Sequence, residues 1–167
     1  MEDAVQEHAS FPDCWIGTWR SLVIFLHNKA PSVEEYNTAV VCQRAMASKH
    51  PEGFVVLTVL SEQDRRVRGV DEELRRRIAD SGREFWRSRL ALVRVVLGTG
   101  FFAMLARGVV RGLSVLQQNA MQEKTMSTVS EAAGFLAPLM SGAERAVSAV
   151  EIERAVDQAY TLWKARA

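Results

Sequence analysis

The chain has 167 residues, of which 48% are hydrophobic and 25% are charged. This length and composition are typical of one globular domain that buries its core without disulfides or a structural metal. The formal net charge of +1, from 21 basic and 20 acidic residues, excludes a global electrostatic attraction to nucleic acid or anionic lipid.

The N-terminal part is predicted to contain an arm and a pair of strands. Residues 1–10 are polar and are expected to form a flexible arm. The stretch from Cys14 to His27 is rich in Trp, Ile, Val and Phe, and a turn or bulge at Gly17 or over Thr18–Arg20 would make it an antiparallel hairpin. Its continuous apolar run Leu22–Leu26 is typical of a central strand that is covered on both faces.

Helices and strands are expected to alternate after this hairpin. Ser32 and Glu35 have the spacing of a capping box, which predicts a helix from there to about His50. The pattern then predicts, in chain order, a strand at 54–60, a helix at 70–89, a strand at 90–97, a helix at 101–118, a short edge strand at 125–128 and a helix at 128–139. This order predicts an α/β fold with a mixed, mostly parallel sheet of about five strands flanked by helices.

The last part of the chain, residues 143–167, has no strand signal. Its apolar residues recur at roughly helical spacing, so an additional C-terminal amphipathic helix is predicted. Val156, Tyr160 and Trp163 are its interface candidates, because Trp and Tyr are common interface anchors. This helix either docks on its own sheet or covers a second copy of the chain in a homodimer.

Three segments carry a resemblance to a known superfamily. They are the hairpin Trp15–His27 leading into the capped helix at Ser32, the strand Phe54–Leu60 followed by a polar loop from Ser61, and the segment Lys124–Leu136, which contains Thr-Val-Ser-Glu-Ala. In this order they resemble STAS-like domains, including the SpoIIAA-like anti-sigma-factor antagonists, in which a T-x-x-E-A helix start follows the final short strand. The resemblance implies one STAS-like domain over residues 11–142 and a non-catalytic regulatory function in binding another protein.

Ser61 is the candidate regulatory residue of this resemblance. Antagonists of the superfamily carry a D-S-S-G-type segment with a phosphorylatable Ser or Thr after the central strand. The matching place here reads Leu-Ser-Glu-Gln-Asp and lacks both the Asp before the serine and the Gly after it. A phosphoryl group on Ser61 would meet two repelling carboxylates, which two following arginines could offset. Ser61 is therefore either a phosphorylation site or a hydroxyl that caps its loop.

Further candidate binding residues lie in the turn Gly98-Thr99-Gly100 and in the helix after it. Backbone N–H groups at a turn between a strand and a helix can hold an anion, so Thr99 and Gly100 are candidates for contacting a ligand. The pattern G-x-G-x-x-G is incomplete, and a tight packing turn is the alternative. Arg107 and Arg111 would either meet an acidic partner or form a solvated helix face.

These residues leave a second function open. A small ligand, a nucleotide or a lipid could bind at the carboxyl edge of the sheet near Ser61 and Thr99. Nucleic acid is not expected as a partner, because the arginines of 64–89 alternate with carboxylates. The pairs Asp71–Arg75, Glu72–Arg76 and Glu73–Arg77 have the i,i+4 spacing of a surface of ion pairs.

Catalytic and metal-binding patterns are missing from the sequence. Cys14 and Cys42 form no CxxC pair and are predicted to be buried, reduced thiols. No histidine has the spacing of a metal ligand, and no G-x-S-x-G elbow exists. We therefore expect no enzyme activity, no metal and no cofactor. The polar N-terminus and the short apolar runs predict a cytoplasmic protein with no membrane span.

Overall fold

Six strands lie in one sheet in the same order as in the chain. The computed structural model describes residues 4–61, 70–98, 108, 122–140 and 146–166. The strands are β1 (Gln6–Ser10), β2 (Cys14–Trp19), β3 (Leu22–His27), β4 (Phe54–Leu60), β5 (Arg89–Val96) and β6 (Gln122–Met126). Strand β2 is antiparallel to both of its neighbours, β1 and β3, whereas β3, β4, β5 and β6 run parallel to one another. The predicted mixed α/β sheet with an N-terminal antiparallel hairpin is confirmed, with one strand more than expected.

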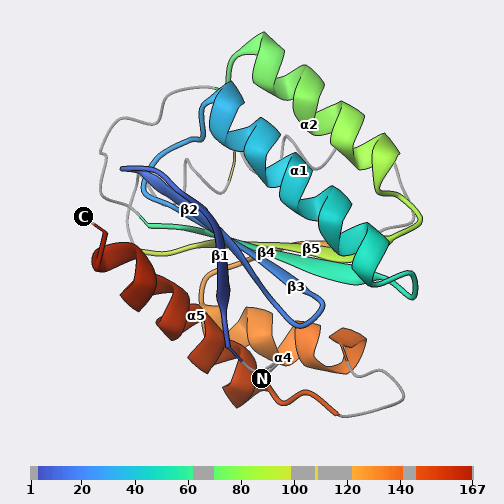
Figure 1. Cartoon of the computed structure of the whole chain (residues 1–167), viewed down its shortest axis with the longest axis vertical. Helices are drawn as coiled ribbons and strands as arrows, with labels where there is room; N and C mark the ends of the chain where they lie inside the picture. The colour runs from blue at the N-terminus through green and yellow to red at the C-terminus, as the bar shows by residue number, and fades with distance from the viewer. Residues whose placement is uncertain (1–3, 62–69, 99–107, 109–121, 141–145, 167) are drawn as a thin grey trace.

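Helices cover both faces of this sheet (Figure 1). They are α1 (Val33–Lys49), α2 (Glu72–Glu84), α4 (Val129–Met140) and α5 (Ala149–Lys164). Each parallel strand lies beside its predecessor, so right-handed crossovers place α1 and α2 on the same face. Figure 1 shows these two helices on one side of the sheet and α4 and α5 on the other. The predicted C-terminal helix is confirmed as α5.

The central strands contribute to two cores, because successive side chains of a strand point to opposite faces. In β3, Leu22, Ile24 and Leu26 belong to the core beneath α4 and α5, whereas Val23 and Phe25 belong to the core beneath α1. All five side chains are buried. The continuous apolar run therefore does mark a strand that is covered on both faces.

The N-terminal residues differ from the prediction of a flexible arm over 1–10. Residues Gln6–Ser10 form the edge strand β1, which is antiparallel to β2. Its carboxylate Glu7 accepts a hydrogen bond from Trp15 Nε1 at 3.0 Å and forms an ion pair with Arg166 at 3.3 Å. An edge strand with exposed side chains needs few apolar residues, so its sequence resembles that of a loose arm.

Side-chain caps fix where the helices begin. Glu35 N donates to Ser32 Oγ at 3.1 Å, and Ser32 N donates to Glu35 Oε2 at 2.7 Å, which is the predicted capping box of α1. Asp71 caps α2 by accepting a hydrogen bond from Leu74 N at 2.8 Å. Helix α2 ends at Glu84, earlier than the predicted Arg89, because Arg89 already belongs to β5. The predicted helix over 101–118 lies outside the described residues. None of the described helices is both long and apolar enough to cross a bilayer.

Candidate functional site

Ser61 lies at the carboxyl edge of the sheet, directly after β4. Its backbone N–H donates to the carbonyl oxygen of His27, the last residue of β3, at 2.9 Å. Its hydroxyl forms a hydrogen bond of 3.0 Å with the hydroxyl of Tyr160 on α5, in which either oxygen can be the donor. Ser61 and Tyr160 are both partly buried. The hydrogen bond therefore ties the C-terminal helix to the strand end where open α/β sheets bind their ligands.

The three interface candidates of α5 pack within the chain. Val156 and Trp163 are buried in the core between α5 and the sheet, and Tyr160 packs against the same core. Trp163 Nε1 donates to the carbonyl oxygen of Phe11 at 3.1 Å, and its ring stacks on that of Tyr160 with centroids 6.3 Å apart. Burial raises the pKa of Tyr160, against the opposing effect of its bond to Ser61. In this structure the helix docks on its own sheet, which is the first of the two predicted arrangements.

A buried histidine lies next to Ser61. His27 Nδ1 is 2.7 Å from the carbonyl oxygen of Lys29, to which it can only donate, and the ring stacks on Phe25 with centroids 4.9 Å apart. Burial lowers the pKa of His27, although the Lys29 carbonyl and the charge of Glu35 act in the other direction. The imidazole is therefore neutral, with its proton on Nδ1. Its Nε2 is buried without a hydrogen-bond partner in the described part of the chain.

The two cysteines are buried, free thiols, as predicted. Cys14 lies opposite His27 in the antiparallel pair of β2 and β3. Burial, with the nearby charges of Glu35 and Asp13, raises the pKa of Cys14 far above its ordinary value. Burial also raises the pKa of Cys42, to about 12. Because the thiolate is the nucleophilic form, neither cysteine is activated for covalent chemistry.

No family model, curated protein or solved structure matches this chain.

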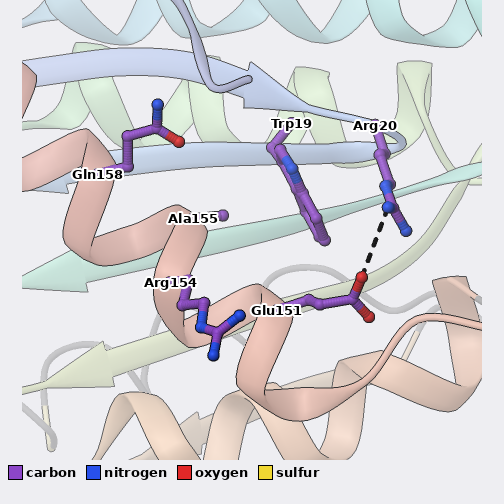
Figure 2. A pocket seen from close by; sticks show the side chains of 6 residues that line it. All are labelled: Trp19, Arg20, Glu151, Arg154, Ala155 and Gln158. Atoms are coloured by element: carbon purple, nitrogen blue, oxygen red, sulfur yellow. Dashed lines mark ion pairs between the residues drawn. The ribbon is translucent and has the colours of Figure 1, made fainter. Parts of the chain in front are cut away.

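A hollow of about 170 Å³ lies at the opposite, amino edge of the sheet. It is lined by Trp19, Arg20, Glu151, Arg154, Ala155 and Gln158. Figure 2 shows Trp19 and Arg20 reaching from the β2–β3 hairpin towards α5, which supplies the other four residues from one side of the helix. The i, i+3, i+4 and i+7 spacing of the α5 residues places them on that one side.

The turn residue Arg20 is held by several contacts in this hollow. Trp19 pairs with Leu22, so Arg20 and Ser21 form the two-residue turn, in which Arg20 has a φ of 51°. This left-handed conformation is uncommon for a residue other than glycine, asparagine or aspartate. The guanidinium lies 4.7 Å from the centre of the Trp19 ring, and its Nη2 is 3.5 Å from Glu151 Oε1. Packing on Trp19 and attraction to Glu151 thus accompany a strained backbone.

The charged surface of α2 contains two of the three predicted ion pairs. Arg76 lies 3.9 Å from Glu72, and Arg77 lies 3.9 Å from Glu73. Asp71 caps the helix in place of pairing with Arg75, because the N-cap position directs its carboxylate to Leu74 N. The candidates Thr99, Gly100, Arg107 and Arg111 lie outside the described residues. Among the described residues, no cluster of three or more His, Cys, Asp or Glu could hold a metal ion.

Sequence reasoning missed the hollow at the amino edge. One signal was available, since Ser148 and Glu151 have the spacing of a capping box, and both of its hydrogen bonds are present. This box would have placed the start of α5 and shown which helix face Glu151 and Arg154 share. That this face meets the β2–β3 turn depends on how α5 docks, which the local pattern does not encode.

Proposed function

We propose that this protein is a non-catalytic regulatory module that binds another protein through the carboxyl edge of its sheet around Ser61. The observation that carries the proposal is the hydrogen bond between Ser61 and Tyr160. It holds a partly exposed hydroxyl at the edge where open α/β sheets bind ligands, next to the C-terminal half of α5. The element order that resembles STAS-like domains supports the same function. Cytoplasmic action is part of the proposal.

The groups near Ser61 favour binding over covalent chemistry. The Cys14 thiol is fully buried and its pKa is raised, so it stays protonated. The His27 ring is neutral, and its Nδ1 proton is engaged by a backbone carbonyl. A nucleophile needs a lowered pKa or an adjacent base within hydrogen-bond reach. These residues therefore support the carboxyl edge as a recognition surface.

The same geometry bears on the role of Ser61 and on the kind of partner. The bond to Tyr160 supports Ser61 as a hydroxyl that joins the end of β4 to α5, in place of a phosphorylation site. Val156 and Trp163 are buried against their own sheet, which supports a different protein as the partner over a second copy of this chain.

The test compares three baits that differ at one exposed or partly exposed serine. Wild type, Ser61→Glu and the control Ser48→Glu are immobilised and exposed to lysate from the native host. Ser48 is exposed on α1, which covers the face of the sheet opposite to α5. Retained proteins are identified by mass spectrometry and purified, and their dissociation constants are measured by calorimetry.

We expect at least one partner that Ser61→Glu weakens by about tenfold or more, because a charge at the edge disrupts polar recognition. Ser48→Glu should bind like wild type. Tyr160→Phe keeps the ring but removes the hydrogen bond, and should weaken the same partner to a smaller degree. Equal binding by all baits would overturn the proposal, as would a partner that is sensitive only to Ser48→Glu. Saturable binding of a nucleotide or lipid at this edge, with no protein partner, would favour a ligand-binding function instead.

A further inference from the structure

The hollow at the amino edge has the charge of an anion site. Two guanidinium groups, of Arg20 and Arg154, line it together with the single carboxylate of Glu151. Arg154 is exposed and makes no ion pair with any described residue, whereas Arg20 forms an ion pair with Glu151. The lining therefore has one positive charge in excess.

Partial burial strengthens the electrostatic interactions of these charged groups. The side chains of Arg20 and Glu151 are only 17% and 25% exposed, so water screens their interactions less than on an open surface. The first turns of α5 add the positive end of the helix dipole to the same place. Trp19 lines the hollow beside the guanidinium of Arg20, as the close-up shows (Figure 2), and exposes 4% of its surface.

We propose that this hollow binds a carboxylate that carries a small apolar group. A monoanion matches the one excess positive charge, whereas Glu151 repels a phosphate dianion more strongly than a monoanion. A guanidinium binds a carboxylate through two parallel N–H donors, and the apolar part lies against the apolar lining residues Trp19 and Ala155. The volume of about 170 Å³ is below that of pockets for drug-sized ligands, which fits a small acid or a single chain terminus.

The turn fixes where the guanidinium of Arg20 lies. A two-residue hairpin turn takes a positive φ at its first central residue, which is the conformation of Arg20. Glycine would adopt this conformation without strain. The turn places the guanidinium 4.7 Å from the centre of the Trp19 ring, with Nη2 3.5 Å from Glu151 Oε1. The site lies at the edge opposite Ser61 and does not depend on the function proposed for Ser61.

The test titrates the ¹⁵N-labelled full-length protein and follows the Trp19 indole and arginine Nε–H resonances. The probes are benzoate, phenyl phosphate at pH 8 and neutral benzyl alcohol. A second pair, N-acetyl-Gly-Phe acid and its amide, separates peptide C-termini from free acids. The variants are Arg154→Gln, Arg20→Gly and Glu151→Gln, with Arg75→Gln on α2 as the matched exposed-arginine control.

The variants are expected to change the affinity in different directions. Benzoate should bind wild type and Arg75→Gln alike, with a dissociation constant of about 1 mM. Arg154→Gln and Arg20→Gly should weaken binding by about tenfold, and glycine keeps the turn conformation, so Arg20→Gly should fold. Glu151→Gln retains the capping box, which accepts either residue, and should tighten binding of benzoate about fivefold and of phenyl phosphate by more.

The outcomes distinguish a free acid from a chain terminus as the source of the carboxylate. They also show when the proposal fails. Saturable binding of benzoate assigns the site to free acids, and binding of the peptide acid but not of its amide or of benzoate assigns it to chain termini. No saturable shift with either acid would overturn the proposal. Unchanged affinity in Arg154→Gln, or weaker binding in Glu151→Gln, would overturn it as well.

Discussion

Arg89 Nη1, at the start of β5, donates a hydrogen bond of 2.9 Å to the side-chain oxygen Oε1 of Gln43 on α1. Both side chains are buried, Arg89 with 3% of its surface exposed. The guanidinium also lies 5.8 Å from the centre of the Phe85 ring. Burial lowers the pKa of Arg89, which shows that its environment disfavours the charge. The buried guanidinium of Arg89 thus joins α1 to the sheet, and its charge depends on hydrogen-bond acceptors such as Gln43.

We expect Gln43→Leu to lower the free energy of unfolding by about 1.5–3 kcal/mol, because it removes a neutral acceptor from a buried cation. Urea denaturation followed by circular dichroism measures this change. Arg44→Gln, one residue along α1, removes an exposed ion pair with Glu84 and should leave stability nearly unchanged. Equal effects of the two substitutions would contradict a role for the Arg89 bond in stability.

The pKa of His27 predicts a pH dependence of stability. Its pKa in the folded protein is lowered, so below the ordinary histidine pKa the unfolded chain binds more protons than the folded one. This contribution to stability should therefore be complete above the ordinary histidine pKa of about 6.5 and should be lost progressively as the pH falls below it. His27→Phe keeps the stacking position on Phe25 and should flatten this slope. His8→Gln, at an exposed position on β1, should retain it, and denaturation at several pH values separates the two.

Alanine substitutions at two glycines should change the stability of the protein in opposite directions. A Cβ on Gly17 would lie 2.5 Å from the carbonyl oxygen of Gln6 and 2.2 Å from the Trp15 ring. Gly17→Ala should destabilise the protein by about 1–3 kcal/mol through overpacking, and should free β1 from β2. A Cβ on Gly134 of α4 would meet nothing within 4 Å, so Gly134→Ala should stabilise the protein by about 0.5–1 kcal/mol. Thermal denaturation measures the stability of both variants, and amide exchange of β1 measures its release in Gly17→Ala. Stability changes of the same sign in the two variants would refute this account.

The cysteines should resist alkylation in the native state. Both thiols are buried with raised pKa values, so iodoacetamide at neutral pH should modify them only after the structure opens. Mass spectrometry should find both unmodified in buffer and both modified in urea. Rapid labelling of Cys42 in folded protein would show that α1 does not pack as described.

The apolar runs predicted the sheet because their information is local. Leu22–Leu26 is continuously apolar and Phe54–Leu60 is apolar except for Thr58, and each is a central strand with two covered faces. The capping box of Ser32 also lies within four residues and was correctly predicted. The strand β1 was missed because an edge strand with solvent-facing side chains carries no apolar signal.

The contacts of the candidate sites join residues that are far apart in the chain. Ser61 and Tyr160 are 99 positions apart, and Arg89 and Gln43 are 46 apart. Arg89 belongs by sequence to a run of arginines that looks solvated, and only the packing of α1 on the sheet buries it. The same holds for Arg20, whose partner Glu151 comes from the last helix. Side-chain chemistry identified Ser61 and Tyr160 as candidates, but how the helices dock decided which residues meet.

The order of the sheet has a consequence for synthesis on the ribosome. Strands β1, β2 and β3 leave the exit tunnel before α5, yet this later helix covers one of their faces. Until α5 emerges, the nascent chain presents Trp15, Leu22 and Ile24 to the surrounding solution. Such a surface is an aggregation hazard and a substrate for chaperones, so the speed of translation up to and through α5 bears directly on yield.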